Sequence, residues 1–324
     1  MIGLLAALLF CFAAIFVSGG FLTTLGDRIS ENSSLGHHVM GMFFLAAVTS
    51  LPELSAGLAA AGISRLPDIA VGEILGSCVF NLTILGVADL LSRRPVIAAR
   101  GRAPFLNGVT GFVLLVIAAL ALRTPGPAAL VSWLAGGAIA AVYMAGLVGV
   151  RRLENKTQTQ PRTATPGTSL TKLWLQFAAA SLLVIGPGLW LPSLAATLSR
   201  EAGISESLVG TFLVGAFTSA PEMIVTWHCL RRGWTVMALG NLMGSNLFNI
   251  LILVPMDAVY TGGSLYRAAG GEHLFTVLAA MAMTAMVILA GVWRRRAVHT
   301  PRFRAEGVLL LVAYAAVFFF LVSR

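Results

Sequence analysis

The sequence contains little charge, few cysteines and no motif of a familiar enzyme. Only 11% of its 324 residues are charged and 57% are hydrophobic, which excludes an ordinary soluble domain and indicates an integral membrane protein. Cys11, Cys78 and Cys229 lie far apart in apolar segments, which disfavours a disulfide framework or a zinc site. A paired catalytic aspartate motif, a Ser/His dyad and HExxH are all missing. We therefore expect neither an enzyme nor a protein with a bound cofactor.

Hydrophobic runs of roughly 20 residues, the length that crosses a bilayer as an α-helix, occupy most of the chain. Ten are expected, near residues 2–23, 39–62, 69–91, 103–122, 127–149, 173–198, 207–230, 234–260, 274–293 and 307–322. The long polar interruption between the fifth and sixth runs is rich in Thr, Pro and Gln and is typical of a linker. The sequence thus predicts an all-α membrane protein with a first five-helix repeat over 1–150, a linker over 151–172 and a second five-helix repeat over 173–324.

Positive charge alternates between the loops. The 22 Lys and Arg residues divide into 17 in the loops after the odd-numbered runs and five on the opposite side. The positive-inside rule therefore places both termini outside the cell membrane and the 151–172 linker in the cytoplasm. Because each half has an odd number of spans, the two repeats are expected to be inverted. The net charge of +9 is explained by this topology, and we expect no nucleic-acid partner.

A polar motif occurs twice inside the hydrophobic runs, first in Thr49–Asp89 and again in Thr218–Asp257. Its first part repeats at an offset of 169 and its second part at 168. The matched pairs are Thr49/Thr218, Ser50/Ser219, Pro52/Pro221, Glu53/Glu222, Gly72/Gly240, Gly76/Gly244, Ser77/Ser245, Asn81/Asn249 and Asp89/Asp257. A polar motif duplicated within membrane spans predicts a duplicated binding site.

The two glutamates, Glu53 and Glu222, lie near the middle of their runs, and no run contains Lys or Arg. A charged residue at a helix centre costs about 2.5–3.5 kcal/mol on insertion scales, so such a carboxylate must be protonated, hydrated or paired with a cation. A single glutamate of this kind is often protonated and hydrogen-bonded within the bundle. Two at matching positions of an inverted repeat favour cation ligands.

The neighbouring residues suit the same role. Pro52 and Pro221 should free the carbonyls of Val48 and Phe217. Carbonyls, hydroxyls and carboxylates together make the all-oxygen site that Ca²⁺ and Na⁺ prefer. In each repeat a Ser and an Asn four residues apart share one helix face, and paired glycines allow close helix packing.

These motifs, TSLPE with GSCVFN and TSAPE with GSNLFN, resemble the α-1 and α-2 repeats of the sodium/calcium exchanger family in the Ca²⁺:cation antiporter superfamily. The resemblance implies a secondary active antiporter working by alternating access, with the first and sixth spans sliding against the core. It implies Glu53 and Glu222 as central Ca²⁺ ligands, with Na⁺ sites flanking them. The implied ion-site residues are Thr49, Ser50, Glu53, Ser77, Asn81, Thr218, Ser219, Glu222, Ser245 and Asn249.

Four residues depart from the usual family pattern. Val48 and Phe217 stand where Gly usually precedes the Thr-Ser pair, Glu73 stands where Asn is usual, and Cys78 replaces the Asn that the second repeat keeps at Asn246. Glu73 is either a solvated vestibule carboxylate or a third site carboxylate that exchanges protons.

Two antiporter hypotheses therefore remain open: exchange of Ca²⁺ for Na⁺, and cation/proton exchange (Ca²⁺/H⁺ or Na⁺/H⁺) on the same scaffold. A channel is disfavoured because an inverted repeat with broken helices is typical of a carrier. The expected partners are inorganic cations and membrane lipid, and the expected functional unit is a monomer.

The histidines lie at or near loop ends and are interpreted as interfacial: His37, His38, His228, His273 and His299.

Overall fold

The computed structural model describes residues 1–32, 46–92, 95–97, 102–155, 169–296 and 304–324, and every regular element in these ranges is a helix. The first half contains α1 (Ile2–Asn32), α3 (Leu51–Leu58), the π-helix η1 (Ala59–Ile63), α4 (Pro67–Leu91), α5 (Arg102–Arg123) and α6 (Ala128–Asn155). The second half contains α7 (Leu170–Ala202), α8 (Glu206–Leu208), the π-helix η2 (Val209–Val214), α9 (Gly215–Thr218), α10 (Ala220–Arg232), α11 (Thr235–Val259), α12 (Leu265–Ala268), α13 (His273–Arg296) and α14 (Ala305–Val322).

Within these described residues, eight helices are long and apolar enough to cross a membrane, and the bent segment from Glu206 to Arg232 makes a ninth. The remaining predicted run, 39–62, is described from residue 46 onward, where Leu51–Ile63 forms a shorter apolar helix. Its first part, 39–45, lies outside the described residues.

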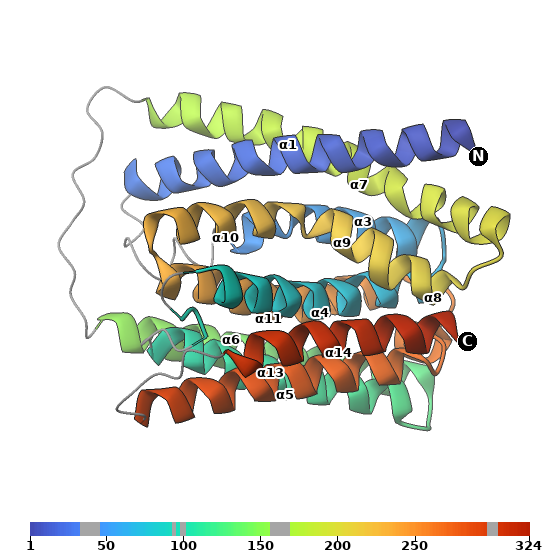
Figure 1. Ribbon diagram of the computed structural model, residues 1–324. Helices are drawn as coiled ribbons and strands as arrows, with labels where there is room; N and C mark the ends of the chain where they lie inside the picture. The colour runs from blue at the N-terminus through green and yellow to red at the C-terminus, as the bar shows by residue number, and fades with distance from the viewer. Residues whose placement is uncertain (33–45, 93–94, 98–101, 156–168, 297–303) are drawn as a thin grey trace.

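The helices lie side by side in three groups (Figure 1). Helices α1 and α7 pack along each other on one side of the molecule. The broken helices and the buried helices α4 and α11 form the middle, and α5, α6, α13 and α14 lie on the other side. Helices α4 and α11 are largely buried and carry apolar residues around most of their circumference, as a buried helix requires.

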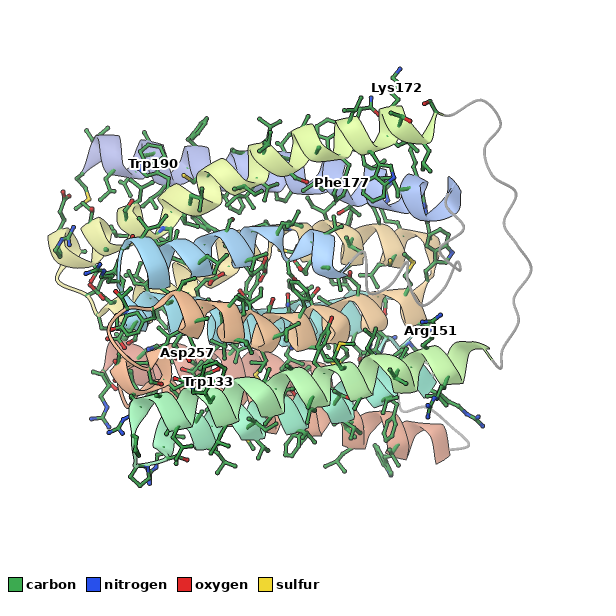
Figure 2. The ribbon with its side chains drawn as sticks, turned by 180° about the vertical axis from the view of Figure 1, so that it is seen from behind. Trp133, Arg151, Lys172, Phe177, Trp190 and Asp257 are labelled. Carbon is green, nitrogen blue, oxygen red and sulfur yellow. The ribbon has the colours of Figure 1, made fainter. Side chains whose placement is uncertain are left out.

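Large apolar side chains cover much of the outer surface. Trp133 on α6 is 81% exposed, Phe319 on α14 69% and Trp190 on α7 49%; Trp133 and Trp190 are labelled in Figure 2. Exposed apolar surface of this extent fits a lipid environment rather than water.

The chain breaks its helix at the same point in each repeat. Ser50 (φ −89°, ψ 16°) and Ser219 (φ −80°, ψ 12°) leave helical geometry just before the following helices, α3 and α10. Pro52 and Pro221 then occupy the first turns of those helices, where the missing N–H costs least. The second break bends its span by 47°. The duplicated proline therefore places a helix end, with its unpaired backbone groups, inside the bundle.

Asp89 and Asp257, which occupy matching positions in the two repeats, each accept hydrogen bonds from the turn that follows their helix. Oδ1 of Asp89 accepts the amides of Val96 and Ile97 at 2.7 and 3.0 Å. Oδ1 of Asp257 accepts the amide of Leu265 at 2.7 Å. Both carboxylates thus fix the turn that follows a long buried helix.

Both chain termini lie at one end of the bundle, whereas α6 ends and α7 begins at the opposite end (Figure 1). Arg151 and Lys172 accordingly lie at the end opposite Asp257 (Figure 2).

Candidate cation-binding site

The ten residues predicted from the sequence are all buried, and none is more than 1% exposed. They come from the two helix breaks and from α4 and α11, which pack together in the middle of the molecule. The Ser-x-Pro-Glu sequence explains how the glutamates reach the site. The helix is interrupted at the serine, and the next helix begins with the proline and the glutamate in its first turn.

The two glutamates exchange hydrogen bonds between the repeats. Ser219 Oγ donates to Glu53 Oε1 at 3.0 Å, and Ser50 Oγ donates to Glu222 Oε1 at 3.3 Å. Since Ser50 matches Ser219 and Glu53 matches Glu222, these two bonds are related by the internal repeat. Each carboxylate is therefore positioned by the opposite half of the chain.

Several acceptor oxygens around these carboxylates have no hydrogen-bond partner among the described residues. They include Oε2 of Glu53, Oε2 of Glu222, Oδ1 of Asn81 and Oδ1 of Asn249. Thr49 and Ser245 also lie beside the Glu222 carboxylate. Burying unpaired acceptors is costly, and oxygen donors of this kind match the needs of a hard cation.

The remaining hydroxyls join α4 to α9. Ser77 Oγ donates to the Gly215 carbonyl at 3.2 Å and lies 3.4 Å from Thr218 Oγ1. A side chain at Gly76 would collide with the backbone of Thr211. The predicted close approach of the glycine pair is therefore observed here, and it brings Ser77 to the break in the second repeat.

Comparison with known proteins identifies the family of this chain. The sequence model described as "Sodium/calcium exchanger protein" matches residues 3–150 and 172–323. The chain belongs to this exchanger family. It is thus a membrane cation antiporter and belongs to a transporter family rather than a catalytic one.

Individual relatives agree with the family assignment. The chain is 29% identical to CaxA of Alkalimonas amylolytica over 93% of this chain and 96% of that protein. It is 32% identical to the sodium/calcium exchanger MaX1 of Methanosarcina acetivorans, over 35% of this chain and 30% of MaX1. The structure of the sodium-calcium exchanger NCX_Mj superposes with a TM-score of 0.67 at 20% identity, covering 98% of this chain and 99% of that one. The fold is therefore the ten-helix inverted repeat expected from the sequence.

The position of Glu73 contradicts one of the two roles predicted for it. Its side chain is fully buried and its carboxylate lies beside Thr218, but neither carboxylate oxygen meets a donor at full hydrogen-bond geometry among the described residues. A Cβ atom at Gly57 on α3 would lie 3.1 Å from Glu73 Oε2, and the charge of Glu73 acts on Glu53. The expectation of a solvated vestibule carboxylate is wrong, because α3 covers this face of α4.

The prediction of freed carbonyls is also wrong at one position. A backbone amide at the C-terminal cap of α9 donates to the Phe217 carbonyl. The turn at Ser219 thus recovers a bond that Pro221 cannot make.

A contact between the matched positions Cys78 and Asn246 was missed from the sequence. Asn246 Nδ2 donates to the Cys78 carbonyl at 3.2 Å, and Asn81 Nδ2 donates to Asn246 Oδ1 at 3.0 Å. Their matching positions in the repeat were the available signal, because matched positions meet where the repeats cross. Asn246 therefore orients Asn81.

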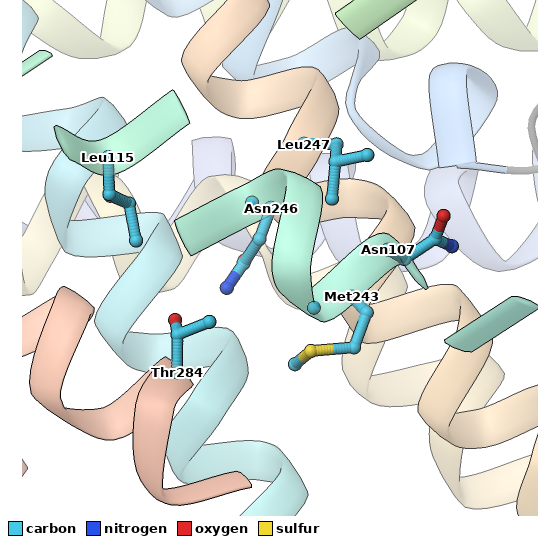
Figure 3. A pocket seen from close by; sticks show the side chains of 8 residues that line it. Asn107, Leu115, Met243, Asn246, Leu247 and Thr284 are labelled. Carbon is cyan, nitrogen blue, oxygen red and sulfur yellow. The ribbon is translucent and has the colours of Figure 1, made fainter. Parts of the chain in front are cut away.

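A small cavity of about 10 Å³, roughly the room for one water, lies on the other side of Asn246. Figure 3 shows Asn107, Asn246 and Thr284 among its lining residues. Both polar side-chain atoms of Asn107 lack a hydrogen-bond partner among the described residues.

Proposed function

We propose that this antiporter exchanges Ca²⁺ for Na⁺ across the cell membrane by alternating access. The observation that carries the proposal is the pair of buried glutamates, held crosswise by serines of the opposite repeats and each with one unpartnered oxygen. Two carboxylates can neutralise one Ca²⁺, and the surrounding hydroxyl and amide oxygens can complete the six to eight ligands that Ca²⁺ takes. MaX1 and NCX_Mj, which are named as sodium/calcium exchangers, support the same pair of ions.

Glu53 and Glu222 are proposed as the central Ca²⁺ ligands. The flanking cation ligands are proposed to be Thr49, Ser50, Ser77, Asn81, Thr218, Ser219, Ser245 and Asn249. One chain would supply the whole site, so the proposed functional unit is a monomer whose two repeats, 1–150 and 173–324, each contribute half. Ca²⁺ and Na⁺ are cargo in this scheme.

The proton-coupled alternative rests on Glu73. A third buried carboxylate without a basic partner requires a proton or a further cation. On this alternative a proton takes the place of Na⁺ as the counter-ion.

Ion flux in proteoliposomes distinguishes Na⁺-coupled from proton-coupled exchange. The purified chain is reconstituted, and Ca²⁺ uptake is followed under an outward Na⁺ gradient or an outward proton gradient of equal size. We expect uptake that saturates and requires the Na⁺ gradient. Uptake driven only by the proton gradient would establish the alternative, and uptake without any counter-ion would exclude an antiporter.

A further inference from the structure

Three metal-ligating side chains meet at the end of the bundle where the chain termini lie, away from the central glutamates. Asp68 is the second residue of α4, His273 is the first residue of α13, and Glu272 immediately precedes it. One ligand atom from each lies within 4.8 Å of the others. None of the three is one of the matched pairs of the duplicated motif.

His273 is fully buried, and its interpretation as an interfacial residue is therefore wrong. Its Nε2 lies 3.1 Å from Asp68 Oδ1 and 3.3 Å from Ser207 Oγ. Two ligands of one tetrahedral zinc ion, with bonds of about 2.0–2.2 Å, lie roughly 3.3 Å apart. The spacing of His273 and Asp68 is thus close to that of two ligands on one metal.

The two carboxylates are held in place by neighbours. The Gly270 amide donates to Asp68 Oδ1 at 2.6 Å, and Ser207 Oγ donates to Glu272 Oε1 at 2.6 Å. Hydrogen bonds of this kind orient metal ligands. Each carboxylate retains a second oxygen, and both side chains are partly exposed, so an ion can reach the cluster from the surrounding medium.

We propose that Asp68, Glu272 and His273 form a binding site for a divalent transition metal of the Zn²⁺ class. One imidazole and two carboxylates select such ions over Ca²⁺ and Mg²⁺, which prefer oxygen ligands alone. Binding requires the lone pair of His273 Nε2. A neutral imidazole binds the metal as its Nδ1–H tautomer, so its proton moves from Nε2 to Nδ1, and metal bonds to Nε2 and to Asp68 replace the hydrogen bond between them. Water fills the remaining coordination position.

The local charge favours a cation. Glu206 on α8 is close enough to Asp68 for their charges to interact, and Arg200 acts on Glu206 in turn. Counting these five groups with His273 neutral leaves three negative charges and one positive charge. The cluster is therefore net negative before a metal binds.

The site joins the two repeats. Asp68 belongs to the first half of the chain, whereas Ser207 and His273 belong to the second, at the start of the bent span and of α13. A bound ion would tie α4 to both elements. It should therefore raise the thermal unfolding temperature of the protein, since it binds the folded state selectively.

Binding of radioactive Zn²⁺ to the full-length chain purified in detergent tests the site. Saturating Ca²⁺ and Na⁺ are present to compete at the central glutamates. We expect about one Zn²⁺ per chain, with the affinity weakened at least about tenfold in His273→Gln. Glutamine keeps an amide that can donate to Asp68, so the variant removes the metal ligand but retains the hydrogen bond. His228→Gln, an exposed histidine on α10, is the matched control and should bind Zn²⁺ as the parent does.

Asp68→Asn and Glu272→Gln provide a second test, because their partly exposed positions tolerate substitution if His273→Gln does not fold. X-ray absorption at the zinc edge should show an imidazole and oxygen ligands without sulfur. The proposal is overturned if the parent binds no Zn²⁺, or if folded ligand variants bind it unchanged. Zn²⁺ binding that is lost in Glu53→Gln but kept in the ligand variants would place the metal at the central glutamates instead.

Discussion

Each central glutamate is held by a serine of the other repeat, so neither half of the chain can form the site alone. Ser50 contacts Glu222 and Ser219 contacts Glu53. Removing the charge from either glutamate should therefore damage one shared site rather than one of two independent sites.

Glu53→Gln and Glu222→Gln should each abolish cation exchange while leaving the amount of folded protein unchanged. Glutamine has nearly the same shape and can still accept a hydrogen bond from the serine. A unit charge at 4 Å contributes about 4 kcal/mol at an effective dielectric of 20, so the loss in cation affinity should be at least about 100-fold. Calcium flux in proteoliposomes measures the exchange activity, and size-exclusion chromatography measures the amount of folded protein.

Glu201→Gln is the control for these variants, because Glu201 is exposed near the end of α7, where its carboxylate lies 3.5 Å from the N-terminal amine. It should transport like the parent. Near-normal transport by either central variant would mean that the glutamate is structural and stays protonated within the bundle.

Glu73→Asn restores the residue that is usual in the family and tests the third buried carboxylate. If a proton must leave Glu73 before a cation binds, acid should weaken transport by the parent, and the variant should lose this pH dependence. Its counter-ion preference should also move towards Na⁺. Calcium flux measured across a pH series under each gradient gives both results, and Glu73→Gln shows whether side-chain length matters. An unchanged pH profile and ion preference would make Glu73 a bystander.

At the scale of the helices, two matched glycines lie where the paired helices α1 and α7 meet the broken helices. A Cβ atom at Gly19 on α1 would clash with Pro221, and one at Gly188 on α7 would clash with Ser55 and lie 3.4 Å from the Pro52 carbonyl. These glycines are 169 residues apart, the offset of the motif itself. The α1–α7 pair therefore approaches each helix break through a glycine, where no side chain of α1 or α7 intervenes.

Gly188→Val should slow transport at least about tenfold while leaving cation binding nearly intact, because the added side chain projects into α3 across the sliding surface. Gly186→Val is a matched control on the same helix, since a Cβ atom there would meet nothing within 4 Å. Calcium flux and equilibrium calcium binding are compared for both. If the two variants transport equally, the α1–α7 pair does not move against α3 at this point.

The elements could be predicted from the sequence where a local rule decides them. Pro52 and Pro221 lack the amide that a helix interior needs, and their duplication beside Glu53 and Glu222 predicted the two helix breaks. Glu73 shows the limit of such rules, because helical periodicity gives the direction of a side chain but not what covers it. The pairing of Asp68 with His273, 205 residues later, depends on how the two halves pack, which no local pattern records.

At the scale of the whole molecule, the position of the positive charges agrees with the path of the chain. Arg151 and Lys172 flank the 151–172 linker at the end of the bundle away from Asp257 (Figure 2), and the termini lie at the other end (Figure 1). The fold thus fixes which ends share a side of the membrane. The excess of Lys and Arg predicts which side faces the cytoplasm.

Cysteine labelling in intact cells tests that orientation. Cys11, Cys78 and Cys229 are all buried, so an impermeant thiol reagent should find little background. A cysteine introduced at Thr159, in the part of the linker outside the described residues, should resist labelling until the cells are opened. One introduced at Ala202, exposed at the end of α7, should be labelled at once, because it lies at the end of the bundle that carries the termini. The opposite pattern would invert the molecule in the membrane and place the proposed Zn²⁺ cluster in the cytoplasm.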